Sequence, residues 1–177
     1  NGNWVSYRFL YSNSIDTTFV VQTKTMKKFI FPNAVSGQFD GEKSFAFIKK
    51  EGLVLFDLKS CTEKLLPNVS RFAFSADGLY LVTLENASTL VIRKNETTIE
   101  RIENVSTYEW NNDKTKLVYA TSKTGSGSVG CLSFKNTFSK QQILKPTTQT
   151  FEVFKWQNNG NFVAFYGVDK GNEAVYY

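Results

Sequence analysis

A glycine-rich stretch is the first candidate for chemistry in this sequence. Gly125 to Gly130, GSGSVG, matches the pattern Gly-x-Gly-x-x-Gly, which cradles a dinucleotide pyrophosphate when a strand precedes it and a helix begins at its end. A strand-like run precedes this stretch, but the residues that follow it, CLSFK, have the pattern of another strand. Without a helix N-terminus there is no dipole to hold a pyrophosphate. We therefore predict a flexible hairpin loop here, and no cofactor.

Acid–base and metal chemistry have few candidate residues. The chain contains no histidine, so neither a Ser-His-Asp triad nor a His-ligated zinc site can form within it. Asp40, Asp77 and Asp113 occur at equivalent places in polar turns, where aspartate is a common turn former. The two cysteines, Cys61 and Cys131, have a spacing that fits neither a zinc site nor a disulfide framework. We expect no catalytic residue, no metal ligand and two free thiols.

These residues belong to an internal repeat with a period of roughly 40 residues, the length of a four-stranded propeller blade. The repeat is anchored by aligned turn residues, most of them glycine and each preceded by an acidic or amide residue. The aligned pairs are Asp40-Gly41, Asp77-Gly78, Asp113-Lys114 and Asn159-Gly160, and the same frame reaches Gly2. Asp-Gly at a hairpin tip supplies a residue that tolerates positive φ.

Each repeat contains the same order of strand-like runs. An alternating run such as RFAF leads into the polar turn, and a continuous apolar run such as LYLVTL follows it. A third run such as TLVIRK and a weaker fourth run such as TIERI complete the unit. The second run is apolar on both faces, as expected for a strand buried between neighbouring sheets. Residues Thr97 to Val105 could form an amphipathic helix, but their place in the repeat favours an edge strand.

The sequence therefore predicts an all-β fold, a β-propeller segment of about four four-stranded antiparallel, WD-like blades with incomplete first and last blades. We place all 177 residues in one segment. The predicted blade ranges are 1–34 (partial), 35–67, 68–103, 104–146 and 147–177 (partial). Both flanking units carry a second and a third strand, so they do not complement each other. We expect a piece of a larger propeller.

Composition restricts the possible partners. A hydrophobic content of 41% is enough for a core, and the net charge of +5 is spread along the chain. Nucleic-acid binding needs cations gathered on one face with exposed aromatic residues between them, whereas the aromatic residues here fall at core positions. We expect no nucleic-acid partner, and the sequence has no apolar run long enough to span a membrane. Sequons begin at turn-like asparagines: Asn68, Asn86, Asn95 and Asn104.

The first part of the chain also carries a family resemblance. Trp4 to Tyr7, Asp16 to Val20, and Phe31-Pro32 through Gly37 and Phe39 resemble the N-terminal propeller of bacterial members of the prolyl oligopeptidase and dipeptidyl peptidase IV family of serine peptidases. In that family the propeller caps an α/β-hydrolase domain and restricts which peptides reach its triad. The resemblance implies a hydrolase domain C-terminal to Tyr177, peptide substrates, and a periplasmic or secreted location. The paired-glutamate motif that anchors a substrate N-terminus in dipeptidyl peptidases is not found here.

Other functions stay open on the sequence. The phrases TYEWNNDKTKLVYAT and FKWQNNGNFVAF also resemble the WD-type propellers of eukaryotic initiation-factor scaffolds and periplasmic TolB-like propellers. A stand-alone scaffold for protein–protein binding is therefore the alternative to a peptidase segment. Propellers bind through loops, and the candidates are Gly125 to Gly130 and Ser12 to Asp16, between which the sequence does not choose. Oligomeric state and ligand are equally open.

Overall fold

The computed structural model describes residues 2–10, 15–158, 160–169 and 172–177. Within these residues it contains eighteen β-strands and no helix, which confirms the predicted all-β fold. No helix in this part of the chain is long and apolar enough to cross a membrane. The chain forms two compact units, Asn1–Phe72 and Ala73–Tyr177, and the boundary between them falls within strand β8.

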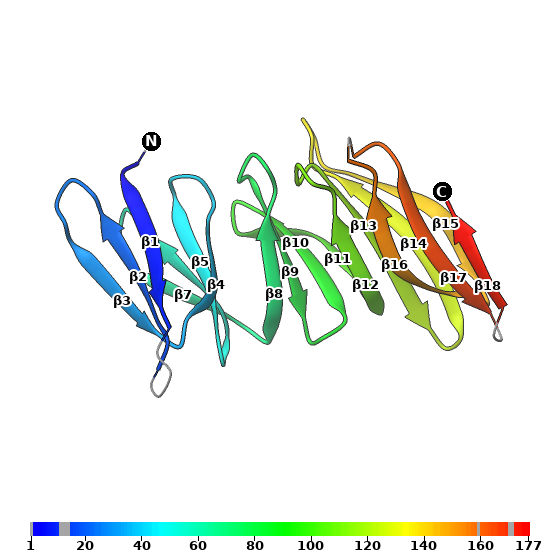
Figure 1. Cartoon of the computed structure of the whole chain (residues 1–177), viewed down its shortest axis with the longest axis horizontal. Coiled ribbons are helices and arrows are strands. Elements are labelled where there is room, and N and C mark those ends of the chain that lie inside the picture. The colour runs from blue at the N-terminus through cyan, green and yellow to red at the C-terminus, as the bar shows by residue number, and fades with distance from the viewer. Residues whose placement is uncertain (1, 11–14, 159, 170–171) are drawn as a thin grey trace. The chain divides into compact units, whose positions relative to one another are not determined.

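Unit 1 contains two antiparallel sheets whose strands follow one another in chain order (Figure 1). The first is three-stranded, with β1 (Trp4–Phe9), β2 (Thr17–Gln22) and β3 (Lys28–Pro32). The second is four-stranded, with β4 (Val35–Phe39), β5 (Ser44–Lys49), β6 (Gly52–Asp57) and β7 (Glu63–Pro67).

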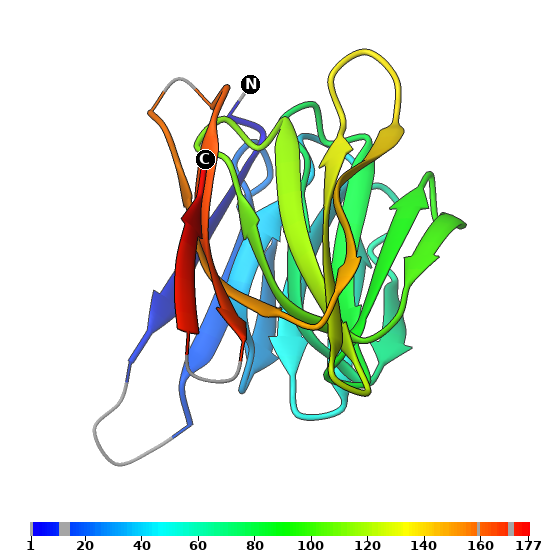
Figure 2. The same cartoon turned by 90° about the vertical axis from the view of Figure 1, so that its right-hand side faces the viewer.

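The other three sheets have the same meander topology. One four-stranded sheet contains β8 (Val69–Phe74), β9 (Tyr80–Glu85), β10 (Thr89–Lys94) and β11 (Thr97–Ile102). The next contains β12 (Val105–Trp110), β13 (Lys116–Lys123), β14 (Ser126–Ser133) and β15 (Ser139–Thr147). The last is three-stranded, with β16 (Thr150–Trp156), β17 (Val163–Asp169) and β18 (Asn172–Tyr176), drawn orange to red in Figure 2.

The four-stranded sheets and the two incomplete flanking sheets agree with the predicted repeat. Residues Thr97–Ile102 form the edge strand β11, so the edge-strand prediction is confirmed over the helical one. The residue numbers assigned to the blade boundaries stay a prediction.

The core of unit 1 lies between its two sheets. Val20 and Phe31 from the first sheet pack with Phe45, Phe47 and Phe56 from the second, and all five side chains are buried. Ring pairs such as Phe31–Phe47, with centroids 4.6 Å apart, cross from one sheet to the other. Because neither sheet can cover its own apolar face, each depends on the other for burial.

In unit 2, strand β13 shows why the second run of each repeat is apolar throughout. Leu117 and Tyr119 point to one face of the sheet and pack with residues of β9 and β10. Val118 and Ala120 point to the other face and pack with Phe151 and other residues of the last sheet. Both faces of residues 117–120 are covered by neighbouring sheets, which explains the continuous apolar run in this part of the strand.

The turns that precede the second strands have the predicted backbone conformation. The φ angles of Gly41, Gly78 and Gly160 are 109°, 70° and 69°, and Gly2 has a φ of 66°. Lys114, which occupies the same place in the repeat, has a φ of 54° without being glycine. Lys114 therefore has the positive φ that its alignment with the glycines of the other repeats predicts. Asn159 lies outside the described residues.

A buried charged network lies on the sheet that contains β9, β10 and β11. Arg93 donates to Glu85 at 2.6 Å and to the Thr83 hydroxyl at 2.8 Å, and Thr83 donates to Glu85 at 3.0 Å. The side chains of Arg93 and Glu85 are only 11% and 10% exposed. Arg101 reaches the same carboxylate at 3.4 Å, but its side chain is 54% exposed.

We expect Arg93→Met to lower the free energy of unfolding by about 3 kcal/mol, because it leaves the buried carboxylate of Glu85 with a neutral hydroxyl from Thr83 and only the exposed Arg101 as a charged partner. The matched variant Arg101→Met removes an exposed partner of the same carboxylate and should cost less than about 1 kcal/mol. Urea unfolding followed by circular dichroism measures both values. Equal losses in the two variants would contradict the assignment.

Candidate functional site

The glycine-rich stretch is not a loop. Ser126–Ser133 forms strand β14, and the turn before it consists of Thr124 and Gly125. The predicted flexible loop from Gly125 to Gly130 is therefore wrong in extent, because all but its first residue pair with β13. The prediction that a strand rather than a helix follows is correct.

Each glycine of the stretch has a structural reason. Gly125 has a φ of 76° in the turn. A Cβ at Gly127 would lie 2.2 Å from the backbone oxygen of Gln149, and one at Gly130 would lie 2.3 Å from the hydroxyl of Tyr119. Such distances are far below van der Waals contact, so these positions exclude larger residues. The spacing that imitates a dinucleotide motif follows from a tight turn and two close approaches.

The aspartates at the hairpin tips stabilise the turns. Asp40 accepts hydrogen bonds from the amides of Lys43 and Ser44 at 3.0 and 2.8 Å. Asp113 accepts from the Thr115 hydroxyl at 2.6 Å and from its amide at 3.1 Å. These bonds, the hydroxyl first, hold the pKa of the Asp113 carboxyl below its ordinary value. Asp77 accepts similarly from its own turn.

The two cysteines are free thiols, as predicted. Cys61 has a φ of 60° in the turn before β7 and packs against the core of unit 1. Cys131 lies in β14, where burial raises the pKa of its thiol. A raised pKa leaves little thiolate at neutral pH, so Cys131 is a poor nucleophile. Across the residues that the structure describes, no cluster of His, Cys, Asp or Glu could hold a metal ion.

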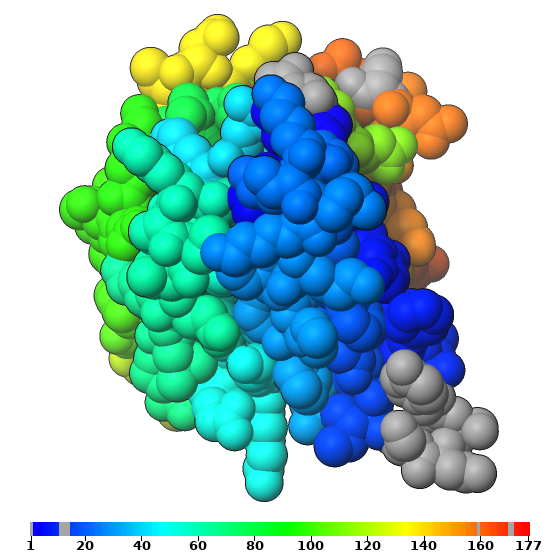
Figure 3. All heavy atoms as spheres, turned by 90° about the vertical axis from the view of Figure 1, so that its left-hand side faces the viewer, coloured from blue at the N-terminus to red at the C-terminus, as the bar shows by residue number. Residues whose placement is uncertain are grey.

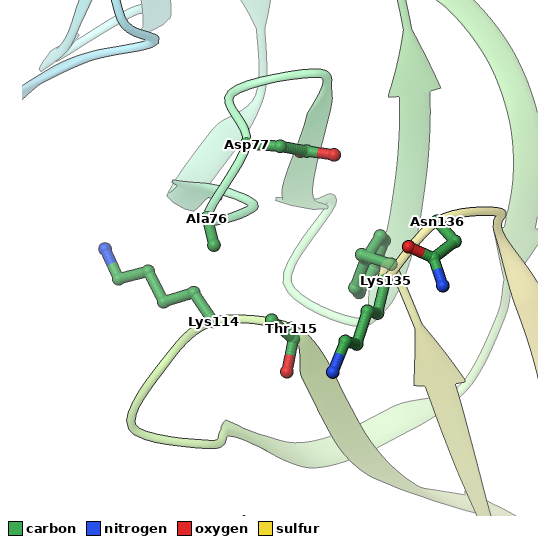
Figure 4. Close-up of a pocket in the computed structure, with 7 residues that line it drawn as sticks. Ala76, Asp77, Lys114, Thr115, Lys135 and Asn136 are labelled. Carbon is green, nitrogen blue, oxygen red and sulfur yellow. The ribbon is translucent and has the colours of Figure 1, made fainter.

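A polar pocket of about 300 Å³ lies at one end of the sheets in unit 2 (Figure 4). It is formed by three turns: β8–β9, β12–β13 and β14–β15. Its lining residues are Ala76, Asp77, Lys114, Thr115, Phe134, Lys135 and Asn136. The amide of Ala76 donates to the carbonyl of Lys114 at 3.1 Å, so two of the turns are joined directly.

The pocket presents two cationic side chains. Phe134 lines the pocket and is buried. The side chains of Lys114 and Lys135 are exposed and extend in different directions (Figure 4). The carboxylate of Asp77 already accepts from Ser75 and from the Leu79 amide. The lysines therefore offer cationic hydrogen-bond donors at the rim of a pocket whose carboxylate is engaged within its turn.

The repeat pattern in the sequence singles out some of the residues that line this pocket and not others. Asp77 and Lys114 were identified as repeat turn residues, whereas Lys135 and Asn136 lie in a turn of the third and fourth strands that the alignment did not single out. Besides Gly125 to Gly130, the sequence predicts a binding loop at Ser12 to Asp16. Its residues Ser12 to Ser14 lie outside the described residues. At its described end, Asp16 accepts a hydrogen bond from Arg8 at 2.5 Å.

Solved structures match this fold along nearly its whole length. The β-propeller domain of the trilobed protease from Pyrococcus furiosus is 14% identical with a TM-score of 0.54, over 97% of this chain and 67% of that one. The acylaminoacyl peptidase of Pyrococcus horikoshii is 14% identical with a TM-score of 0.51, over 99% and 36%. The Cps50 (Swd1) β-propeller domain of Myceliophteria thermophila is 10% identical with a TM-score of 0.52, over 92% and 65%.

These similarities confirm the β-propeller fold. At such identities they show the fold alone, and the chain spans only 36% to 67% of the length of these three proteins. No protein-family model matches the sequence, and no curated protein matches it either.

We expect Gly127→Ala to lower the free energy of unfolding by about 3 kcal/mol, because the backbone oxygen of Gln149 cannot move aside as a flexible side chain can. Ser126→Ala, one residue earlier in the same strand, should change it by less than about 0.5 kcal/mol. Thermal unfolding of both variants measures the difference. A tolerated alanine at Gly127 would show that the close approach is not rigid.

Alkaline pH should destabilise the protein through Tyr119, whose side chain is 4% exposed. Burial, followed by the charge of Glu100, raises the pKa of Tyr119 from 10.0 to about 12. The contribution of protonated Tyr119 to the free energy of unfolding is complete below pH 10, the pKa of an ordinary tyrosine. It is lost as the pH rises through the folded-state pKa of about 12, because Tyr119 ionises at lower pH in the unfolded chain. Between pH 9 and pH 12 the wild type should therefore lose free energy of unfolding relative to Tyr119→Phe, which has no ionisable hydroxyl. A constant difference would contradict the raised pKa.

Proposed function

We propose that this chain is a non-catalytic propeller segment of a larger serine peptidase, in which it docks against an α/β-hydrolase domain and restricts the access of peptide substrates. The observation that carries the proposal is the match to the propellers of two peptidases over 97% and 99% of the chain. The resemblance of Trp4 to Tyr7 and of Asp16 to Val20 to the same kind of peptidase propeller supports it from the sequence.

The aspartates at the hairpin tips and the buried thiol support a non-catalytic role for this chain in the proposed protein. Asp40, Asp77 and Asp113 are occupied by hydrogen bonds that hold turns. The buried thiol of Cys131 has a raised pKa. In the proposed protein the nucleophile, base and oxyanion donors belong to the hydrolase domain, and the propeller contributes size exclusion and a docking rim. The polar pocket at Lys114 and Lys135 is a candidate part of that rim.

A stand-alone binding scaffold is the second candidate function. The similarity to the Cps50 (Swd1) propeller domain, with a TM-score of 0.52 over 92% of the chain, supports it about as well as the peptidase matches support the first. The two functions differ in one testable respect, which is the presence of a serine nucleophile in the same polypeptide.

The native polypeptide should be isolated from its source cells with an antibody raised against these 177 residues and treated with a fluorescent fluorophosphonate. We expect a labelled product much heavier than 20.1 kDa. The 177-residue chain alone is the control and should stay unlabelled. An unlabelled native product would contradict the peptidase assignment and favour the scaffold.

Gating itself is tested on the labelled protein by comparing substrates of different size. A short peptide and a folded protein that contains the same cleavable sequence should differ, with rapid cleavage of the first and none of the second. Equal cleavage of both would exclude a gate even in a confirmed peptidase.

A further inference from the structure

The three turns around the polar pocket are joined by backbone hydrogen bonds. The amide of Ala76 donates to the carbonyl of Lys114 at 3.1 Å, and the amide of Phe134 donates to the carbonyl of Thr115 at 2.8 Å. The first bond links the sheet of β8–β11 to the sheet of β12–β15, and the second lies within the latter sheet. The walls of the pocket are therefore in place before a ligand arrives, which lowers the entropic cost of binding.

Lys114 has a backbone conformation that favours glycine. Its φ is 54°, and the aligned turns of the other repeats have glycine at this place, as Gly41, Gly78 and Gly160. A β-carbon makes a positive φ costly, whereas glycine adopts it freely. A role for the lysine side chain in binding explains this unfavourable conformation, because folding of the turn does not need the side chain.

The two lysines of the pocket are accessible to a ligand. Both side chains are exposed, and within the described part of the chain neither ammonium group forms an ion pair, unlike that of Lys140, which pairs with Glu100. The turn that carries Lys135 extends beyond the strands of its sheet, as the yellow loop between β14 and β15 in Figure 2 shows. The yellow atoms of this segment lie at the surface in Figure 3.

The charges around the pocket favour a ligand group with a single negative charge. Lys114 and Lys135 contribute two positive charges and Asp77 contributes one negative charge, so the lining has a net charge of +1. The carboxylate of Asp113 adds negative charge beside the pocket, because it accepts from the hydroxyl of the lining residue Thr115 at 2.6 Å. A carboxylate meets two ammonium groups there and less repulsion than a doubly charged phosphate does.

The remaining lining residues suit the rest of a glutamate side chain. Asn136 is exposed, and its carboxamide offers an N–H donor to a carboxylate oxygen. Ala76 and Phe134 contribute apolar surface to the lining, on which methylene groups can pack. The volume of about 300 Å³ is at the lower end of the range for ligand pockets, which fits a side chain rather than a large cofactor.

We propose that the pocket with Lys114, Lys135 and Asn136 binds the carboxylate of a glutamate in an acidic segment of a partner protein. An exposed ion pair is worth little in water, so binding needs the further contacts to the rim that a polypeptide supplies. The proposal does not depend on whether the chain belongs to a peptidase or is a scaffold. Its test and the fluorophosphonate test can therefore fail separately.

The test is a titration of the isotopically labelled 177-residue chain with hexaglutamate, followed by NMR. Hexaglutamate should shift the amide signals of the three turns in a saturable manner. Hexaglutamine, which has the same length without the charges, should leave them unchanged. Absence of binding, or shifts spread over the whole chain as expected for attraction to its net charge of +5, would overturn the proposal.

Two pocket variants and one control locate the binding. Lys114→Gly introduces the residue of the aligned turns, so its urea midpoint should be no lower than that of the wild type. This variant and Lys135→Gln should each weaken hexaglutamate binding at least about threefold. Lys123→Gln removes the same charge at the other end of β13 and should change binding less than about 1.5-fold. Equal losses in the control and the pocket variants would overturn the proposal.

Free anions distinguish the source and the kind of the bound group. Acetate and inorganic phosphate should displace hexaglutamate only weakly. Displacement by acetate at an equal concentration of carboxylate groups would overturn the assignment to a polypeptide. Tighter binding of phosphate than of hexaglutamate would overturn the assignment to a carboxylate.

Discussion

A strand that is apolar on both faces is stable only between two other sheets, and β13 illustrates this requirement directly. Leu117 and Tyr119 are buried on one side of their sheet while Val118 and Ala120 are buried on the other. Burial of each such side chain stabilises the fold by about 1.5–3 kcal/mol, a gain that disappears if either neighbouring sheet is removed. Sheet-on-sheet packing is therefore the interaction on which each unit depends.

The turns and the connections between sheets recur at equivalent positions along the chain. Asparagines with positive φ at positions 33, 68 and 104 carry the chain from one sheet to the next, and aspartates at hairpin tips bind the amides that follow them. The aspartate side chains replace backbone partners where the ladder ends. Aspartates would be the first choice for acid–base chemistry in another fold, and here their hydrogen-bonding capacity is used to hold turns.

The polar pocket is one surface of the described residues that is available for recognition once the structural roles are assigned. Lys114 and Lys135 lie at its rim, so it offers charged side chains. Binding of a partner there would be sensitive to salt, because exposed charges are screened.

The sequence by itself determined the strands, their order and the hairpin tips, because these follow from periodicities that are local. Alternation at Phe72 and Phe74 and the continuous run at β13 each reflect which faces of one strand are buried. Only the tertiary structure explains why positions 127 and 130 are glycine, since the atoms that exclude a Cβ there come from Gln149 and Tyr119. The pocket was likewise decided by tertiary structure, because it depends on which turns become neighbours, and no single stretch of sequence specifies that.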